Sequence, residues 1–218
     1  MLIDIHTHTH PISDDSFLDP GKLIEQAKLM GLDGICITDH DRFWKQRDID
    51  ELSQKHDFLV LPGCEITTEE GHLLVYGLQE YIFGMHKASF VKDLVDKAGG
   101  AIIFAHPYRG NYRPEISLTS DDYEAAIKKT CMNKAFSISK GIEISNGRGS
   151  AGENTFSKDT ARFAKMRGTG ASDAHSLTDI GTYATEFEGD IQTLEDLINE
   201  LRFGYFYPYS LGSVKRFT

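Results

Sequence analysis

The sequence contains little cysteine and no long apolar run, and both shortages narrow what the protein can be. Its three cysteines, Cys36, Cys64 and Cys131, are odd in number, lie far apart and form no CxxC pair. This favours reduced core thiols over a disulfide framework or a thiolate zinc site. No apolar run approaches the roughly 18 residues that a membrane-spanning helix needs. The first residues show neither the basic region nor the apolar core of a secretion signal, so we expect a cytoplasmic protein.

The sequence also contains fewer basic than acidic residues. The chain has 23 Lys plus Arg against 33 Asp plus Glu, which gives a formal net charge of −10. This balance argues against broad binding to long nucleic acids, although it allows a small basic pocket. The sequence contains neither GxGxxG nor GxxxxGK[ST], so the two common glycine-rich fingerprints of nucleotide binding are absent.

Short apolar runs alternate with amphipathic stretches along the 218 residues. In residues 190–204, for example, the apolar side chains recur at helical spacing. Because this alternation continues without a break in composition, it predicts one α/β domain over residues 1–218, built on a mainly parallel sheet. Strands are expected at 2–5, 34–38, 58–62, 72–77, 101–105, 141–145, 168–172 and 183–187, and helices at 20–31, 89–100, 121–132, 157–168 and 190–204.

Metal-ligand residue types follow one predicted strand after another. In a parallel α/β barrel the C-terminal strand ends meet at one face and form the active site. A single histidine or aspartate there is usually a surface side chain or a helix cap, but five strand ends of this kind are hard to attribute to chance. The residues are His6 and His8 after 2–5, Asp39, His40 and Asp41 after 34–38, Glu65 after 58–62, His106 after 101–105, and Asp173 and His175 after 168–172.

These candidate ligands offer nitrogen and carboxylate oxygen but no thiolate, a mixture that suits zinc, manganese or iron. A tetrahedral catalytic zinc uses about three protein ligands. The larger number of candidates therefore predicts two or three divalent ions with a bridging carboxylate. Clustered ions hold the attacking and leaving oxygens of a phosphoryl transfer and make hydroxide available near neutral pH. Phosphoester hydrolysis is the leading reaction class.

The motifs HTH, TDHD, PGCE, GH, AHP, IEISNG and SDAH lie in this order between residues 4 and 175. Together they resemble the PHP (polymerase and histidinol phosphatase) family of metal-dependent phosphoesterases. The resemblance implies a distorted (β/α)7 TIM-like barrel with a trinuclear metal centre at its C-terminal face. It implies three ion sites: His6, His8, Glu65 and Asp173 at the first, Glu65, His72 and His106 at the second, and His40, His175 and Asp14, with Asp15 as the alternative, at the third.

Other polar residues near these motifs are candidates for supporting roles. Asp4 and Asp39 are carboxylates that could fix the tautomer of a ligating histidine, although a strand-end carboxylate and a helix cap are the simpler interpretations. His10 continues the alternation of His6 and His8, but Pro11 constrains the chain beside it. We expect His10 to line the mouth of the pocket or to face solvent.

Two arginines and two polar residues are candidate substrate contacts. Arg109 and Arg148 lie on loops at the predicted catalytic face, where a guanidinium can bind a phosphate in a bidentate manner. Asn146 could line the same pocket. Glu143 could do so as well, or it could pair with a lysine on the wall.

The predicted activity is hydrolysis of a small phosphomonoester by metal-activated hydroxide; a nucleotide, a nucleoside bisphosphate and a sugar or amino-alcohol phosphate are the candidate substrates. Glu65, Asp173 and His175 are the predicted catalytic ligands, and Arg109 would absorb charge on the phosphate. An exonuclease on short oligonucleotides is one alternative. An amidohydrolase-like C–N hydrolase is another, although no strand here ends on the lysine that such enzymes commonly carbamylate.

The chain is too short to include the polymerase region of the polymerase-associated family members, which argues against that form. The expected partner is a small phosphorylated substrate, with no long nucleic acid and no membrane. The aromatic stretch 204–218 is expected to close the barrel floor or to form an interface. The sequence leaves the oligomeric state open.

Overall fold

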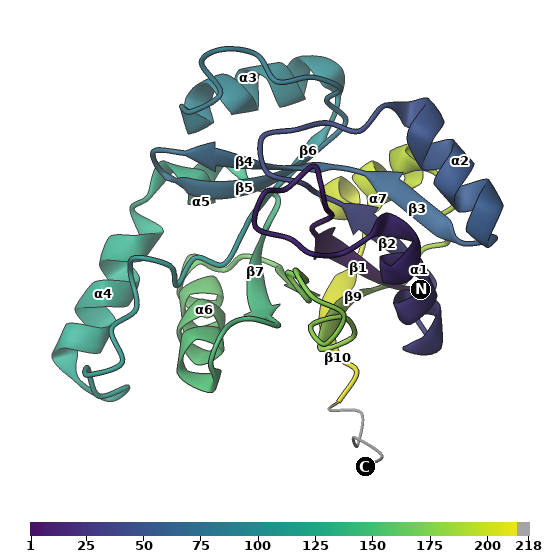
Figure 1. Cartoon of the computed structure of the whole chain (residues 1–218). Coiled ribbons are helices and arrows are strands. Elements are labelled where there is room, and N and C mark those ends of the chain that lie inside the picture. Colours follow the sequence, from purple (N-terminus) through teal and green to yellow (C-terminus); the bar gives the residue numbers. More distant parts are fainter. Residues whose placement is uncertain (213–218) are drawn as a thin grey trace.

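The computed structural model describes residues 1–212 and shows an α/β fold with two five-stranded sheets (Figure 1). The first sheet has the strand order β10-β9-β1-β2-β3, and the second has the order β4-β5-β6-β7-β8. The strands of the first sheet are β1 (Leu2–Thr7), β2 (Gly34–Ile37), β3 (Leu59–Pro62), β9 (Tyr183–Phe187) and β10 (Phe206–Ser210). Those of the second are β4 (Cys64–Thr68), β5 (Gly71–Tyr76), β6 (Ala101–Phe104), β7 (Gly141–Asn146) and β8 (Gly168–Ala171).

Every predicted strand and helix has a counterpart, and four elements were not predicted. These four are the strands β4 and β10 and the helices α2 and α5. Helix α6 begins earlier than the predicted start at 157, because Ser150 and Glu153 form a reciprocal capping box there. The helices are α1 (Pro20–Leu29), α2 (Gln46–His56), α3 (Ala88–Ala98), α4 (Asp121–Cys131), α5 (Lys134–Ile138), α6 (Ala151–Ala164) and α7 (Leu194–Phe203).

Both sheets are mixed, so the prediction of a mainly parallel sheet is only partly right. Strands β1, β2 and β3 are parallel, as are β6, β7 and β8, whereas β9 and β5 run antiparallel to their neighbours. Within residues 1–212 the ladders do not close into one ring, so the (β/α)7 barrel is not confirmed. Two isolated parallel bridges, Thr7–Ala174 and His40–Glu65, nevertheless join the sheets. Both bridges lie where candidate metal ligands follow the strands.

An inner core lies between the two sheets, and α7 packs against one end of it. Ile5 of β1, Leu74 of β5 and Leu197 of α7 are all fully buried in this cluster. Helix α7 lies close to the backbone at Gly77, directly after β5, since a Cβ added at Gly77 would lie 3.2 Å from Ile198. The candidate ligands lie at the other end of the parallel strands. Helix α7 therefore occupies the end of the fold opposite to the site. The stretch 204–218 was predicted to close the barrel floor or to form an interface. Its residues 213–218 lie outside the described part of the chain, and its strand β10 forms an edge of the first sheet.

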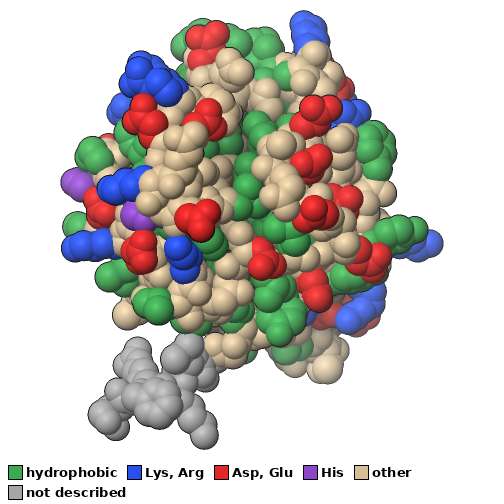
Figure 2. All heavy atoms as spheres, turned by 90° about the vertical axis from the view of Figure 1, so that its right-hand side faces the viewer, with side chains coloured by type: hydrophobic (Ala, Val, Ile, Leu, Met, Phe, Trp, Pro, Cys, Tyr) green, Lys and Arg blue, Asp and Glu red, His purple; other side chains and the backbone are tan. Residues whose placement is uncertain are grey.

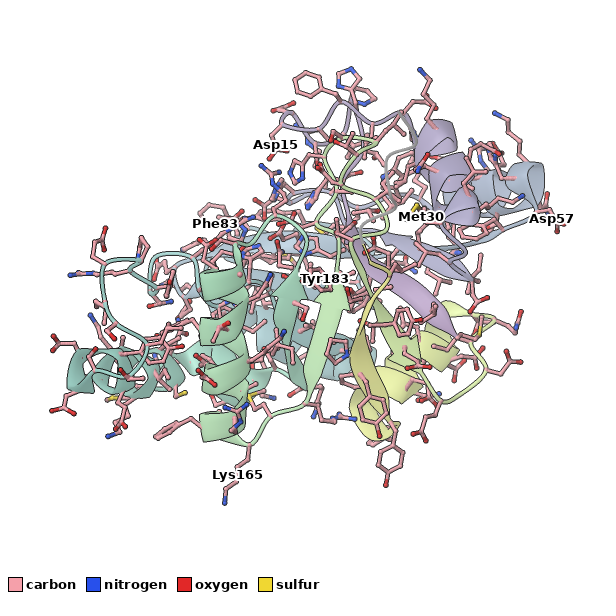
Figure 3. The ribbon with its side chains drawn as sticks, turned by 90° about the horizontal axis from the view of Figure 1, so that it is seen from below. Asp15, Met30, Asp57, Phe83, Lys165 and Tyr183 are labelled. Atoms are coloured by element: carbon pink, nitrogen blue, oxygen red, sulfur yellow. The ribbon has the colours of Figure 1, made fainter. Side chains whose placement is uncertain are left out.

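Five helices cover the outer faces of the sheets, while Tyr123 and Ile127 of α4 pack with Phe156 of α6. Apolar residues of α1 and α2 pack on the first sheet, and those of α3, α5 and α6 pack on the second. Figure 3 shows Asp57 after α2 and Lys165 after α6 at the periphery of the molecule. Acidic side chains are distributed over the face shown in Figure 2. None of the helices within residues 1–212 combines the length and the apolarity that crossing a membrane requires.

Replacement of Phe187 tests whether the cluster between the sheets is the stabilising core. Its ring is 1% exposed and lies 5.9 Å from the ring of Phe206, centroid to centroid. We expect Phe187→Ala to lower the free energy of unfolding by about 3–5 kcal/mol, because the substitution leaves a cavity. The matched control is Phe203→Ala, at a phenylalanine that is 72% exposed, for which we expect a change within about 0.5 kcal/mol. Urea unfolding measures both variants, and equal losses would contradict this assignment of the core.

Candidate metal centre

The chemistry-bearing side chains collect where the C-terminal ends of parallel strands meet β4 and β5. His6 lies in β1 and His8 directly follows it, while His40, His106 and Asp173 follow β2, β6 and β8. Glu65 lies in β4 and His72 in β5. Four overlapping groups place their candidate ligand atoms within 4.8 Å of one another. They are His6–His8–Glu65–Asp173, His40–Glu65–His72, His8–His40–His175 and His6–His106–Glu143.

Glu65 is the centre of the cluster. Its carboxylate is fully buried, and each of its oxygens faces a different set of imidazoles. Oε2 lies 3.1 Å from Nε2 of His6, 3.1 Å from Nε2 of His8 and 3.2 Å from Nδ1 of His40. Oε1 lies 2.7 Å from Nδ1 of His72 and 2.8 Å from Nε2 of His106. One carboxylate therefore connects two sets of nitrogen ligands, which is the geometry that a bridging carboxylate needs.

Two buried atoms in this cluster have acceptors or donors nearby but make no well-aligned hydrogen bond within residues 1–212. They are Nε2 of His8 and Oδ1 of Asp173, and they lie 3.3 Å apart. Buried polar atoms are rarely left unsatisfied, because each one costs free energy. A divalent cation between them would satisfy both, and the nitrogen and carboxylate donors around them suit zinc, manganese or iron. The residues present therefore fit the ions that the sequence predicts.

The third predicted group contains Asp15 where Asp14 was preferred. Oδ2 of Asp15 lies 3.0 Å from Nε2 of His175 and 3.4 Å from Nε2 of His40, whereas Asp14 forms no ion pair with a histidine among residues 1–212. The choice depends on the course of the loop after β1, which the sequence does not specify. His10 is exposed, in line with the expectation for it.

Glu143 has a role that the sequence did not single out. It is fully buried in β7, and its Oε1 lies 3.0 Å from Nδ1 of His6. A proton on Nδ1 donated to this carboxylate leaves Nε2 of His6 free as a ligand atom. Asn146 supports the same carboxylate, since its Nδ2 donates to Glu143 at 2.9 Å and to Asp173 at 3.1 Å. Both donor contacts of Asn146 are thus internal, which does not favour the predicted contact with substrate.

Asp4 and Asp39 are buried, but they stabilise backbone and loop rather than a histidine ring. Oδ1 of Asp4 accepts hydrogen bonds from the backbone N–H groups of His6 and Ser172, at 3.3 and 3.1 Å. It therefore connects β1 to the residue before Asp173. Asp39 accepts from residues of the loop after β1 and from Trp44. The carboxylate that faces the ring nitrogen of a candidate ligand here is that of Glu143.

The two arginines differ in the contacts that they make. The guanidinium of Arg109 donates to Oδ2 of Asp173 at 2.7 Å, and its side chain is 40% exposed. It can therefore reach a ligand in front of the cluster while it contacts the carboxylate. Arg148 is exposed on the loop after β7, and its backbone N–H donates to Oδ1 of Asn146.

Burial and opposite charges shift the pKa values in the cluster. Burial disfavours the ionised form of Glu65, but His6 and the hydrogen bond from His106 hold the pKa of Glu65 well below the ordinary value. Burial also disfavours the charged form of His6, which lowers its pKa. Asp173 and Glu65 nevertheless raise this pKa well above that of a free histidine. The cluster thus offers an ionised carboxylate beside an imidazole that would release a proton if a cation bound to it. For Asp4, burial raises the pKa to about 7.

Two of the candidate ligands have an unusual backbone conformation. His106 and Asp173 have φ angles of 26° and 53°, in the region that favours glycine. Such strain persists where the surrounding contacts hold it, and it is frequent at functional sites. Here the backbone N–H of His106 donates to Glu143 at 2.9 Å, and that of Asp173 donates to the carbonyl of His6 at 2.9 Å.

Comparison with known protein families shows to which family the chain belongs. The model of the PHP domain matches residues 4–145, which is more than half of the chain. The chain belongs to the PHP family. A second model, described as PHP-associated, matches residues 151–205. The single domain over residues 1–218 stays a prediction beside these two matches.

Two curated relatives share part of the PHP sequence. An uncharacterized protein of Methanocaldococcus jannaschii is 27% identical over 117 residues, which cover 50% of this chain and 68% of the relative. A PolC-type DNA polymerase III of Oceanobacillus iheyensis is 29% identical over 103 residues, which cover 47% of this chain and only 7% of the polymerase.

Solved structures share the fold at low identity. A two-domain protein of Bacteroides vulgatus, described as containing a predicted PHP-like metal-dependent phosphoesterase, has a TM-score of 0.64 at 20% identity, over 96% of this chain and 64% of that one. An amidohydrolase from Chromobacterium violaceum with bound sulfate and no metal has a TM-score of 0.59 at 14% identity, over 98% and 99%. A lesion-specific endonuclease from Pyrococcus furiosus has a TM-score of 0.51 at 16% identity, over 95% and 57%. These similarities concern the fold alone.

Proposed function

We propose that this PHP protein is a metal-dependent phosphoesterase that hydrolyses a small phosphomonoester. The observation that carries the proposal is the contact of Glu65 with five imidazoles, beside the unsatisfied atoms of His8 and Asp173. This arrangement supports two or three divalent ions with Glu65 as the bridge. The three sets of ligands are His6, His8, Glu65 and Asp173, then Glu65, His72 and His106, and finally His40, His175 and Asp15.

The ions, when bound, would supply hydroxide near neutral pH and stabilise negative charge on the phosphate. The chain's own residues have separate tasks. Glu143 holds His6 with Nε2 facing the cluster, and the carbonyl of Asp173 does the same for His175, whose Nδ1 lies 2.8 Å away. Arg109, whose guanidinium is partly exposed beside Asp173, would bind the non-bridging oxygens of the phosphate. Burial lowers its pKa, but Asp173, Tyr108 and the nearby glutamates together raise it above the ordinary value, so Arg109 stays charged.

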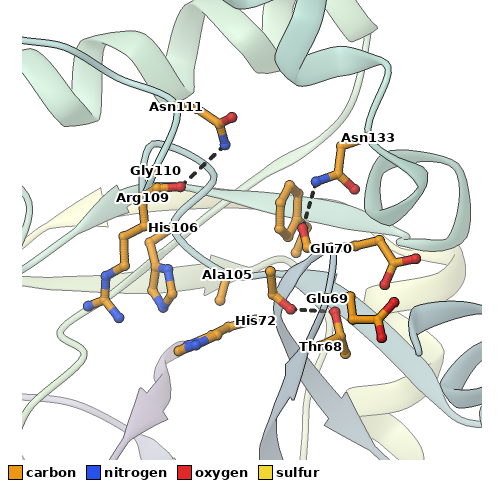
Figure 4. A pocket seen from close by; sticks show the side chains of 12 residues that line it. Thr68, Glu69, Glu70, His72, Ala105, His106, Arg109, Gly110, Asn111 and Asn133 are labelled. Atoms are coloured by element: carbon orange, nitrogen blue, oxygen red, sulfur yellow. Dashed lines mark hydrogen bonds between the residues drawn. The ribbon is translucent and has the colours of Figure 1, made fainter. Parts of the chain in front are cut away.

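A cavity of about 390 Å³ adjoins the cluster and supports a small substrate. Figure 4 shows His72, His106 and Arg109 on one side of it, and Thr68, Glu69 and Asn133 on the other. We propose that the alcohol part of the phosphomonoester lies in this cavity while its phosphate faces the cluster. Its volume lies in the range of ordinary small-molecule sites.

Two alternatives remain as proposals of lower rank. The endonuclease of similar fold favours cleavage of short oligonucleotides, but the net charge of −10 opposes contact with a long polyanion. The amidohydrolase of similar fold favours C–N hydrolysis. In this chain, however, the bridging position is taken by Glu65 and not by a lysine.

Removal of the ions tests the proposal. We expect a chelator to abolish phosphate release from p-nitrophenyl phosphate and from sugar phosphates, and Zn²⁺, Mn²⁺ or Fe²⁺ to restore it. The same preparations are assayed on short oligonucleotides and on an amide panel. Phosphate release that continues in the metal-free protein would refute the proposal, and restored cleavage of oligonucleotides or amides alone would replace it by an alternative.

A further inference from the structure

The carboxylate of Asp39 is the centre of a buried hydrogen-bond network beside the candidate ligands. It accepts from the backbone N–H and the hydroxyl of Thr9, both at 2.6 Å, and from the hydroxyl of Ser13 at 2.8 Å. It also accepts from Nε1 of Trp44 at 2.7 Å. Two of these partners, Thr9 and Ser13, belong to the loop between β1 and α1, while Asp39 follows β2. Asp39 therefore fixes this loop against the second strand.

Ser13 extends the network to two candidate ligands. Its hydroxyl oxygen accepts the backbone N–H of His40 at 3.1 Å and lies 3.4 Å from Nδ1 of His8. Its own backbone N–H donates to the carbonyl of Thr9 at 2.8 Å, which closes a tight turn. The turn from Thr9 to Ser13 is thus connected to Asp39, to the peptide of His40 and to the ring of His8.

Asp15 lies two residues beyond this turn, and Figure 3 labels it on the loop that follows β1. Its side chain is 55% exposed, and its contacts at the site are those with His175 and His40. An exposed side chain on a loop keeps a productive position only if the loop itself is held. A misplacement of about 1 Å is enough to impair a site of this kind.

We propose that Asp39 is a positioning residue that completes the third ligand group by holding the Thr9–Ser13 turn, so that Asp15 faces His40 and His175. The inference rests on the proposed metal-dependent function. A carboxylate is needed because all the partners of Asp39 are donors, whereas an asparagine would present its own N–H groups to some of them. Asp39 thereby acts on a bound ion without touching it.

Binding of Mn²⁺ tests the inference without an activity assay. Electron paramagnetic resonance counts free Mn²⁺ during titration of the metal-free protein, and we compare wild type with Asp39→Asn, Asp15→Ala and the double variant. We expect Asp39→Asn and Asp15→Ala each to weaken the last ion bound by about 10–100-fold and to leave the tighter sites unchanged. Because Asp39 acts through Asp15, the double variant should bind no more weakly than Asp15→Ala.

Controls separate this effect from general damage. Asp33→Asn removes a carboxylate that accepts the backbone N–H of Leu2 at the opposite end of β1, and it should bind Mn²⁺ like wild type. Ser13→Ala should repeat the weakening, and it keeps the test valid if Asp39→Asn does not fold. The inference on Asp39 would be overturned if both Asp39→Asn and Ser13→Ala bound Mn²⁺ with wild-type affinity. It would also be overturned if the losses were additive in the double variant. Neither result would affect the proposed metal centre. A wild-type chain that binds no Mn²⁺ would refute the proposed metal centre as well.

Discussion

Replacement of Glu65 by glutamine is expected to remove phosphoesterase activity and part of the bound metal together. Glutamine keeps the shape of the side chain but loses its charge, and its NH₂ group cannot accept a ligand contact. Loss of a partner that merely supports a ligand costs roughly 10–100-fold. A carboxylate that contacts both sets of imidazoles should cost more, so we expect kcat/KM to fall by at least about a thousandfold. Initial rates and metal analysis on the same preparation measure the two effects.

The matched control for Glu65 is Glu186→Gln on β9, where the glutamate is exposed. This variant should keep wild-type activity and metal content. Circular dichroism shows whether each variant is folded. Full activity in folded Glu65→Gln would contradict the bridging role, and unchanged metal content with lost activity would limit Glu65 to the chemical step.

The second large effect is expected at Arg109. Removal of one preorganised donor to a developing negative charge typically costs about 10²–10³ in rate. We expect Arg109→Ala to reduce kcat/KM for a phosphomonoester by that factor while the protein keeps its ions. Arg109→Lys should be intermediate, since an ammonium retains the charge but not the planar fork of donors. Steady-state kinetics beside metal analysis distinguishes the loss of substrate binding from the loss of ions.

Arg113→Ala is the control for this series, because Arg113 is exposed on the same loop. It should remain close to wild type. Activity of Arg109→Ala within twofold of wild type would exclude Arg109 from substrate binding. A loss of ions in parallel with activity would instead assign Arg109 to holding Asp173 in place.

Much of the fold follows from periodicity and strand-end chemistry. The runs 2–5 and 101–105 are mainly apolar and each is followed by a histidine, and both form strands near the predicted ranges. Strand β4 was not predicted, because its five residues begin only two positions after the end of β3 and no longer turn separates the two strands. Helix α2 was not predicted for a similar reason, since Ile49 is its one buried residue. Short or mostly exposed elements leave weak patterns, and tertiary contacts decide them.

The metal centre, too, was predicted in part from the sequence and in part only from the structure. His6, His8, Glu65, His106 and Asp173 follow or occupy strands whose ends must meet, so the sequence alone was enough to propose them together. The choice of Asp15 over Asp14 was not available from the sequence, because neighbouring loop residues point in directions that only the turn at Ser13 sets. The role of Glu143 also needed the structure, since 137 residues separate it from His6 along the chain.

The sequence by itself determined the family, the strand-helix order and the kinds of ligand atom, because these depend on local patterns and on residue type. Only the tertiary structure decided which atoms face one another: Glu65 between five imidazoles, Glu143 behind His6, and Asp39 beneath the loop that carries Asp15. The physical reason is that these contacts join segments far apart in the chain. Their distances depend on how two separate sheets pack, and no local pattern encodes that packing.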